Sequence, residues 1–233
     1  MTAGTAFIEV WGAVLLALLL LVAFVITVKR LQQRRRARAA AALGLAGVPR
    51  AKPFTDDEAA GSALLHLFNM RAQPGGAQPG VLRGTLGGVE TAIFDYDFTL
   101  KSGFHTSTET AHQTVAALRS APPEAEFLLT ARRKRDWATP EPGKASFDFH
   151  PDFARRYRVE TRQPEALRRL LTGEKLVFLA RLAEKESWTI WCADGWFILY
   201  RQERMVASRK LGRFLEDAQA IVATLQPPPA PGA

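Results

Sequence analysis

The longest hydrophobic pattern in the chain is an apolar run near the amino terminus. Residues 11–28 include no charged side chain, and residues 7–10 extend the apolar character with one interruption at Glu9. A helix of about 22 residues spans about 33 Å, whereas the hydrocarbon core of a bilayer is about 30 Å thick. The pattern therefore predicts a transmembrane helix over residues 7–28, preceded by a short segment 1–6.

Alternating apolar and polar positions, which are typical of β-strands, recur through the rest of the chain. Two such runs flank Gly87-Gly88 and predict one β-hairpin, and two runs flanking Asp194-Gly195 predict another. The predicted strands of these hairpins, with the further strands that the alternation indicates, cover 81–86, 89–100, 108–120, 126–132, about 146–149, about 157–161 and the two halves of 187–202.

Helical periodicity is clearest at the carboxyl end, in residues 207–226. Apolar residues recur there at the spacing of one helix face, with charged residues opposite, which predicts an amphipathic helix packed on the sheet. The apolar positions are Leu211, Phe214, Leu215, Ala218, Ile221, Val222 and Leu225. Shorter helices are predicted over 56–69, over the segment from Pro164 to just before Gly173, and over about 174–186, where a strand is the alternative.

These patterns together predict an α+β fold. An amino-terminal transmembrane helix is followed by one domain with an antiparallel sheet of about six to eight strands and a carboxy-terminal amphipathic helix. The expected organisation is a short extracytoplasmic segment 1–6, the helix 7–28, a basic juxtamembrane linker 29–52, a soluble domain 53–226 and a disordered Pro-rich tail 227–233.

Positive charge is concentrated directly after the apolar run. Residues 29–52 hold eight Lys and Arg and no acidic residue, whereas residues 53–233 hold 23 basic and 22 acidic residues. Because basic residues flank transmembrane helices on the cytoplasmic side, we expect the amino terminus outside and the domain in the cytoplasm. The flank before the apolar run holds Glu9 and no Lys or Arg, unlike a cleavable signal peptide, so a single-pass protein is expected.

The basic cluster also predicts a contact with the membrane surface. Basic side chains near a bilayer attract anionic lipid headgroups by about 1 kcal/mol each. The six candidate side chains are Lys29, Arg30, Arg34, Arg35, Arg36 and Arg38. A topology signal alone is the more common explanation of such a cluster, because nearly every single-span protein needs one. Nucleic acid is not expected as a partner because the domain is nearly neutral; the basic candidates would be Arg132–Arg135, Arg155, Arg156 and Arg158.

The single cysteine, Cys192, excludes an intramolecular disulfide and a cysteine zinc cluster. It lies in a predicted strand, and no histidine is close to it in sequence to activate it. We therefore expect Cys192 to be a packing residue rather than a nucleophile. The sequence predicts no cofactor.

The segment IFDYDFTL, residues 93–100, is the one candidate for catalytic chemistry. It resembles the first motif of the haloacid-dehalogenase-like phosphatases, Asp-x-Asp-x-Thr after a buried strand. The resemblance implies that Asp95 is the nucleophile, Asp97 the acid/base and Thr99 a supporting hydroxyl, with Mg²⁺ bridging carboxylate and phosphate.

The surroundings of this segment favour a different interpretation. Phe98 stands where that family commonly has glycine, and alternation continues through the motif, which predicts an antiparallel strand with Asp95 and Asp97 on an outward polar face. The Gly87-Gly88 turn predicts a hairpin rather than a parallel neighbour. No second pair of acidic residues ends another predicted strand. The phosphatase therefore stays the alternative function.

The wider arrangement resembles uncharacterised bacterial membrane-anchored proteins with an FDY…QTV motif. The segments that carry it are FDYDF at 94–98 and HQTV at 112–115, after a single span and before aromatic strands and a closing amphipathic helix. This resemblance implies no activity. With an anchor present and no complete catalytic set, the expected function is a tethered cytoplasmic domain that binds a protein partner or the membrane surface without catalysis.

Overall fold

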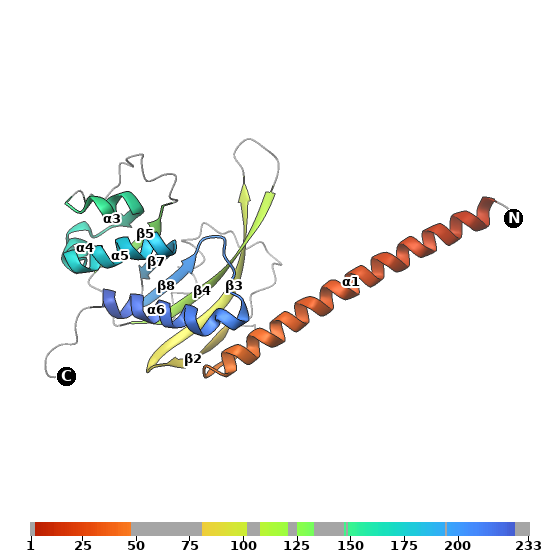
Figure 1. Cartoon of the computed structure of the whole chain (residues 1–233), viewed down its shortest axis with the longest axis horizontal. Coiled ribbons are helices and arrows are strands. Elements are labelled where there is room, and N and C mark those ends of the chain that lie inside the picture. Colours follow the sequence, from red (N-terminus) through yellow and green to blue (C-terminus); the bar gives the residue numbers. More distant parts are fainter. Residues whose placement is uncertain are drawn as a thin grey trace.

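The computed structural model describes residues 3–47, 81–101, 108–120, 125–132, 147, 149–193 and 195–226, which are organised around one antiparallel sheet (Figure 1). Its eight strands lie in the order β1-β2-β3-β4-β8-β7-β5-β6. The predicted α+β fold, with an amino-terminal apolar helix, an antiparallel sheet and a carboxy-terminal helix, is confirmed. The elements are α1 (Ala3–Ala41), β1 (Leu45–Gly47), β2 (Leu82–Leu86), β3 (Val89–Lys101), β4 (Thr108–Arg119), β5 (Phe127–Ala131), α3 (Pro151–Arg156), β6 (Tyr157–Thr161), α4 (Pro164–Leu170), α5 (Gly173–Lys185), β7 (Trp188–Ala193), β8 (Trp196–Arg201), the 3₁₀ turn η2 (Ser208–Lys210) and α6 (Leu211–Leu225).

Both predicted hairpins are present. β2 and β3 are joined by Gly87 and Gly88, whose φ angles of 59° and 82° are both positive, as a type I′ turn requires. β7 and β8 are joined next to Gly195, which also has a positive φ of 73°. The strands predicted at 108–120, 126–132 and 157–161 are confirmed as β4, β5 and β6.

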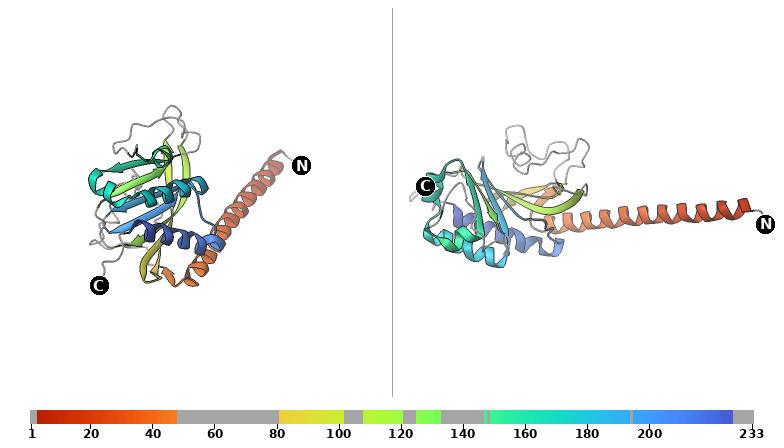
Figure 2. Two further views of the ribbon diagram at one scale, coloured as in Figure 1. Left: turned by 60° about the vertical axis from the view of Figure 1, so that its left-hand side comes forward. Right: turned by 90° about the horizontal axis from the view of Figure 1, so that it is seen from above.

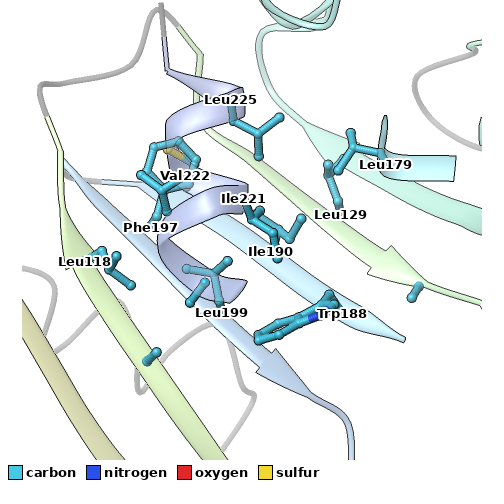
Figure 3. Close-up of a cluster of buried hydrophobic side chains, with 14 of the residues drawn as sticks. Leu118, Leu129, Leu179, Trp188, Ile190, Phe197, Leu199, Ile221, Val222 and Leu225 are labelled. Carbon is cyan, nitrogen blue, oxygen red and sulfur yellow. The ribbon is translucent and has the colours of Figure 1, made fainter. Parts of the chain in front are cut away.

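Helix α6 covers one face of the sheet and builds its main core (Figure 3). All seven of the apolar positions predicted for this helix are buried. Ile221, Val222 and Leu225 lie over Phe197 and Leu199 of the sheet (Figure 3). Nearby, the rings of Trp188 and Phe214 stack with their centroids 5.0 Å apart, and the Arg201 guanidinium lies 4.5 Å from the Trp188 ring. The amphipathic pattern therefore predicted both the helix and its packed face.

The segment between β5 and β6 differs from the prediction. A strand was expected at about 146–149, but Phe147 and Phe149 lie outside any strand, and α3 follows them. Pro151 begins α3, and the His150 ring accepts a hydrogen bond from the Phe153 backbone N–H at 3.3 Å, which caps the helix. Phe147 packs on Phe153 with centroids 5.4 Å apart. The alternating aromatic residues thus pack a loop onto a helix instead of forming a strand.

The next two helices agree with the prediction apart from one boundary. α4 begins at Pro164 as expected and ends at Leu170. Gly173, expected just past the end of this helix, is also the first residue of α5. α5 is a helix and not the alternative strand. Its buried residues Leu176, Leu179 and Ala183 recur at helical spacing against the same core as α6.

The opposite face of the sheet carries a second buried cluster. Its members come mainly from β3, β4, β7 and β8: Val81, Ala92, Phe94, Val115, Ala117, Trp191, Ala193, Trp196, Ile198 and Tyr200. The central strands are therefore buried on both faces. The prediction that β3 turns a polar face outward is wrong for the side chains described there, because Thr91 and Ile93 are fully buried at 0% exposure and Asp95 is half-buried beside α1.

Helix α1 extends without a break from the apolar run into the sheet domain (Figures 1 and 2). It is the one helix in the described part of the chain that is long and apolar enough to span a membrane. Its apolar residues from Val14 to Ile26 are exposed all round, and no side of this stretch packs on the domain. The apolar stretch and the domain contact thus belong to different parts of one helix.

The domain end of α1 passes directly into the sheet. The helix ends at Ala41, Gly44 turns the chain with a φ of 78°, and β1 pairs with β2. The two strands approach closely, since a Cβ on Gly84 would lie 2.5 Å from the Gly44 carbonyl oxygen. Within the segment predicted as a juxtamembrane linker, residues 29–41 are therefore helical and residues 45–47 are a strand; residues 48–52 lie outside the described residues.

Two further predictions lie outside the described residues. These are the helix expected over 56–69 and the tail 227–233.

Candidate functional site

The register of β3 and β4 brings the two halves of the FDY…QTV pattern together. Phe94 lies opposite Val115, Asp95 opposite Thr114, and Tyr96 opposite Gln113. Antiparallel partners directly opposite each other have Cβ atoms about 4.5–5.5 Å apart on the same face. The segments FDYDF and HQTV, which begin 18 positions apart at residues 94 and 112, therefore lie side by side in the sheet.

At this place a side chain from α1 enters the domain. The Arg36 guanidinium Nη2 lies 2.6 Å from the Asp95 carboxylate and donates a hydrogen bond to the Thr114 hydroxyl at 3.2 Å. Its Nη1 donates to the Val206 backbone carbonyl at 2.7 Å. Arg36 thus binds β3, β4 and the segment that follows β8.

Thr114 connects these contacts to one another. Its hydroxyl donates to the Asp95 carboxylate at 2.7 Å and accepts from the Val206 backbone N–H at 2.8 Å. A hydroxyl has one donor and two acceptor sites, so Thr114 satisfies all three within this cluster. We call Arg36, Asp95, Thr114 and the Val206 backbone the Arg36 network. Its connectivity fixes the position of α1 against the sheet.

Burial gives the Arg36 network its electrostatic character. The exposed fractions of the Arg36 and Asp95 side chains are 13% and 24%, so neither is well solvated. Burial lowers the pKa of Arg36, and the nearby Asp95 carboxylate opposes this shift. A half-buried ion pair with several hydrogen bonds is costly to break from one side, because the remaining charge loses its partner.

Helix periodicity explains why Arg36 is the cation that binds the sheet. Arg36, Ala39, Ala40 and Leu43 recur at i, i+3, i+4 and i+7, and the last three pack on the main core. Arg36 continues this domain-facing stripe by one turn. This period is present in the sequence but is masked by the neighbouring arginines, and no local signal indicates Thr114 or Val206 as partners of Arg36, because they lie 78 and 170 positions away.

The other predicted membrane-surface residues differ from Arg36. The side chains of Arg30, Arg34, Arg35 and Arg38 are exposed on α1. The side chain of Lys29 lies outside the described part. Five of the six candidates therefore keep the membrane surface as a proposal, whereas Arg36 has partners within the domain.

The geometry around Asp95 does not favour the phosphatase alternative. β3 is antiparallel to both β2 and β4, and the Asp95 carboxylate already binds Arg36 and Thr114. The side chains of Asp97 and Thr99 are not among those that the structure describes. Among the described residues, no group of three or more His, Cys, Asp or Glu is arranged to hold a metal ion.

The nucleic-acid candidates that are described pair with acidic residues. Arg155 pairs with Asp152, Arg156 with Glu184, and Arg158 with Glu160. Arg132 donates to the Arg155 backbone carbonyl at 3.2 Å. Residues 133–135 lie outside the described residues. These contacts disperse the basic side chains among local partners.

Cys192 is fully buried at 0% exposure in the main core, as expected of a packing residue. Burial raises the pKa of its thiol well above the ordinary value, with a smaller contribution from Glu126. The folded domain therefore holds its one thiol protonated and out of contact with solvent.

Comparison of the chain with protein-family models, with curated proteins and with solved structures found no match.

Proposed function

We propose that this protein is a single-pass membrane protein whose cytoplasmic sheet domain is a non-catalytic interaction module. In this proposal α1 both crosses the membrane and sets the orientation of the domain beneath it. A flexible tether would let the domain tumble, whereas a docked helix presents the same surface of the domain to the bilayer at all times.

The Arg36 network is the observation that carries this proposal. It ties the helix that holds the apolar run directly to β3 and β4, with 2.6 Å between Arg36 and Asp95 and 3.2 Å between Arg36 and Thr114. Arg36 lies eight positions after Val28, the end of the predicted transmembrane helix, which corresponds to about 12 Å along a helix. The attachment point of the domain is therefore close to the membrane boundary that the sequence predicts.

The contacts of Asp95 support the non-catalytic part of the proposal. Asp95, the candidate nucleophile, neutralises Arg36 and accepts from Thr114. A carboxylate that is paired with a guanidinium in this way anchors the helix and is a poor candidate for a nucleophile. The phosphatase alternative instead requires Mg²⁺-dependent hydrolysis of a phosphate ester. Asp95→Asn should abolish that activity. Arg36→Gln, which removes the ion pair but keeps the carboxylate, should leave it unchanged.

Membrane insertion and orientation test the proposal. We expect the full chain to stay in the membrane fraction after washing at alkaline pH. A carboxy-terminal reporter that is active only outside the cytoplasm should stay silent, because the basic residues after Val28 retain that side in the cytoplasm. Release of the protein by the alkaline wash, or an active reporter, would contradict the proposal.

A matched variant separates the topology signal from the Arg36 network. Replacing the exposed Arg30, Arg34, Arg35 and Arg38 with glutamine, while Arg36 is kept, weakens the charge bias and leaves the contacts of the domain in place. The external reporter should then gain activity several-fold. The same reporter on the unaltered chain is the control.

A further inference from the structure

A second basic segment lies beside the basic part of α1. Between Arg201 and Arg213 the chain holds five basic residues and one acidic residue, Glu203. Arg201 binds Glu186 and Asp217 and lies over the Trp188 ring. The other four basic side chains are exposed: Arg204, Arg209, Lys210 and Arg213. Because the domain as a whole is nearly neutral, this is a local concentration of charge.

The structure places this segment against α1. The Val206 carbonyl accepts a hydrogen bond from Arg36, and η2 and the start of α6 pack on α1. Figures 1 and 2 show the first turn of α6 next to α1, while α3, α4 and α5 lie on the far side of the domain. The two basic segments, distant in the sequence, therefore form one region around the helix.

Backbone contacts fix this segment to the sheet. Glu203 has a φ of 56°, the left-handed conformation that residues other than glycine rarely adopt, in the turn where Arg204 N–H donates to the Arg201 carbonyl. The Thr114 N–H donates to the Arg204 carbonyl at 3.0 Å, which fixes the next residues to β4. Met205, 55% exposed, stands between the two basic positions Arg204 and Arg209 as an apolar side chain on the surface.

We propose that this basic segment, residues 204–213, binds the anionic phospholipid headgroups of the membrane that α1 spans, together with the exposed arginines of α1. The inference deepens the proposed function and rests on it. Arg36, and Val206 with it, lies about 12 Å along the helix from Val28, and the headgroup region occupies roughly 5–7 Å of that distance. Beside Val206 the remaining gap is within the reach of arginine and lysine side chains. The start of α6 lies farther along α1, since a Cβ on Gly212 would be 3.8 Å from the Leu43 side chain, and a tilt of α1 toward this side brings it nearer the headgroups.

Charge complementarity favours a lipid surface as the occupant. Cytoplasmic leaflets are rich in anionic lipids, and basic residues next to a transmembrane helix are held there at high local concentration. An exposed methionine among basic residues suits a boundary with an apolar interior below charged headgroups. The acidic groups nearest in sequence are Glu203, Glu216 and Asp217, and Asp217 is engaged by Arg201.

The test uses the full chain in liposomes, with Met205→Cys labelled by an environment-sensitive fluorophore in a Cys192→Ala background. Phosphatidylcholine liposomes are compared with liposomes that also contain phosphatidylglycerol, both with a nitroxide on some headgroups. We expect quenching of the label by the headgroups in the anionic liposomes, with a bound-to-unbound ratio at least about tenfold above that in phosphatidylcholine. Molar salt should reduce the quenching, since the screening length falls to about 3 Å.

Two variants with the same change in charge make the result specific. The first replaces Arg204, Arg209, Lys210 and Arg213 with glutamine and should lose the quenching. The second replaces the exposed Arg162, Arg169, Arg181 and Lys185, which lie on the α4–α5 side, with glutamine and should retain the quenching. Protection of the native Cys192 thiol, with Met205 unaltered, verifies that each set leaves the domain folded.

The outcomes distinguish this inference from the proposed function. Protein that an alkaline wash removes from the liposomes would overturn the membrane span and the inference together. Integrated protein whose label is quenched equally in both liposomes, or equally in both variants, would overturn the inference alone. A label that is shielded in native membranes but not in anionic liposomes that contain no other protein would indicate that an acidic protein, and not the lipid, binds residues 204–213.

Discussion

Replacing Trp188 with alanine should lower the free energy of unfolding of the domain by about 3–5 kcal/mol, the cost of removing a large aromatic side chain from a packed core. Trp188 is 0% exposed and stacks on Phe214 with ring centroids 5.0 Å apart. Arg201 lies 4.5 Å from the Trp188 ring and 5.5 Å from the Phe214 ring, and so covers both. The truncation opens a cavity between β7 and α6 and removes this cation–π contact.

The solvent reactivity of Cys192 measures this effect independently of tryptophan fluorescence. Because the only thiol of the chain is fully buried, its labelling rate by a thiol reagent follows the opening of the domain. Labelling of full-length protein in detergent should accelerate by two orders of magnitude or more for Trp188→Ala. Phe149→Ala, at a side chain that is 64% exposed, is the matched control and should leave the rate nearly unchanged. Equal rates for the two variants would contradict the packing described.

The second large effect is expected at the Arg36 network. Asp95→Ala leaves the largely buried Arg36 guanidinium without this counter-charge, and Arg36→Ala removes the cation beside Asp95 and the donor to the Val206 carbonyl, although Thr114 still donates to Asp95. Because each single change strands a partner, the double variant should lose less stability than the sum of the two singles. The expected coupling energy is about 1–3 kcal/mol, reduced from the fully buried case because Asp95 keeps some solvent contact.

A neighbouring arginine provides the control for this cycle. Arg35→Ala removes the same charge from the same turn of α1, but the Arg35 side chain is exposed. It should change the Cys192 labelling rate and the hydrogen exchange of residues 29–47 by little. Coupling near zero between positions 36 and 95, or an equal effect at position 35, would reduce the Arg36 network to an ordinary surface ion pair.

The sequence predicted those parts of the fold that depend on local pattern. The seven apolar positions of α6, the Gly87-Gly88 turn and the β7–β8 hairpin each have a strong periodic or turn signal, and each is present. The strand expected at 146–149 failed because alternating aromatics also arise where a loop packs on a helix, as Phe147 does on Phe153. Period-two alternation is therefore a weaker indication of a strand where a helix that begins with proline follows directly.

The candidate site was predicted only in part because its residues meet through the fold. Asp95 was singled out for its resemblance to a catalytic motif, and Arg36 for its place in a basic cluster. Nothing local indicated that they bind each other, 59 positions apart in the chain. The prediction that β3 exposes its polar face was also wrong for a physical reason. A carboxylate on a strand is expected to be exposed unless a cation pairs with it, and here Arg36 of α1 is that cation.

The distance between α1 and the sheet domain, measured in a membrane, tests most directly the central claim that the helix is docked. Spin labels at Gln33→Cys on α1 and Arg181→Cys on α5, both exposed positions, are introduced in a Cys192→Ala background of the full chain in lipid nanodiscs. Pulsed electron–electron double resonance between the two spin labels should give a single narrow distance distribution. A broad distribution, as a flexible juxtamembrane chain would produce, would contradict the account.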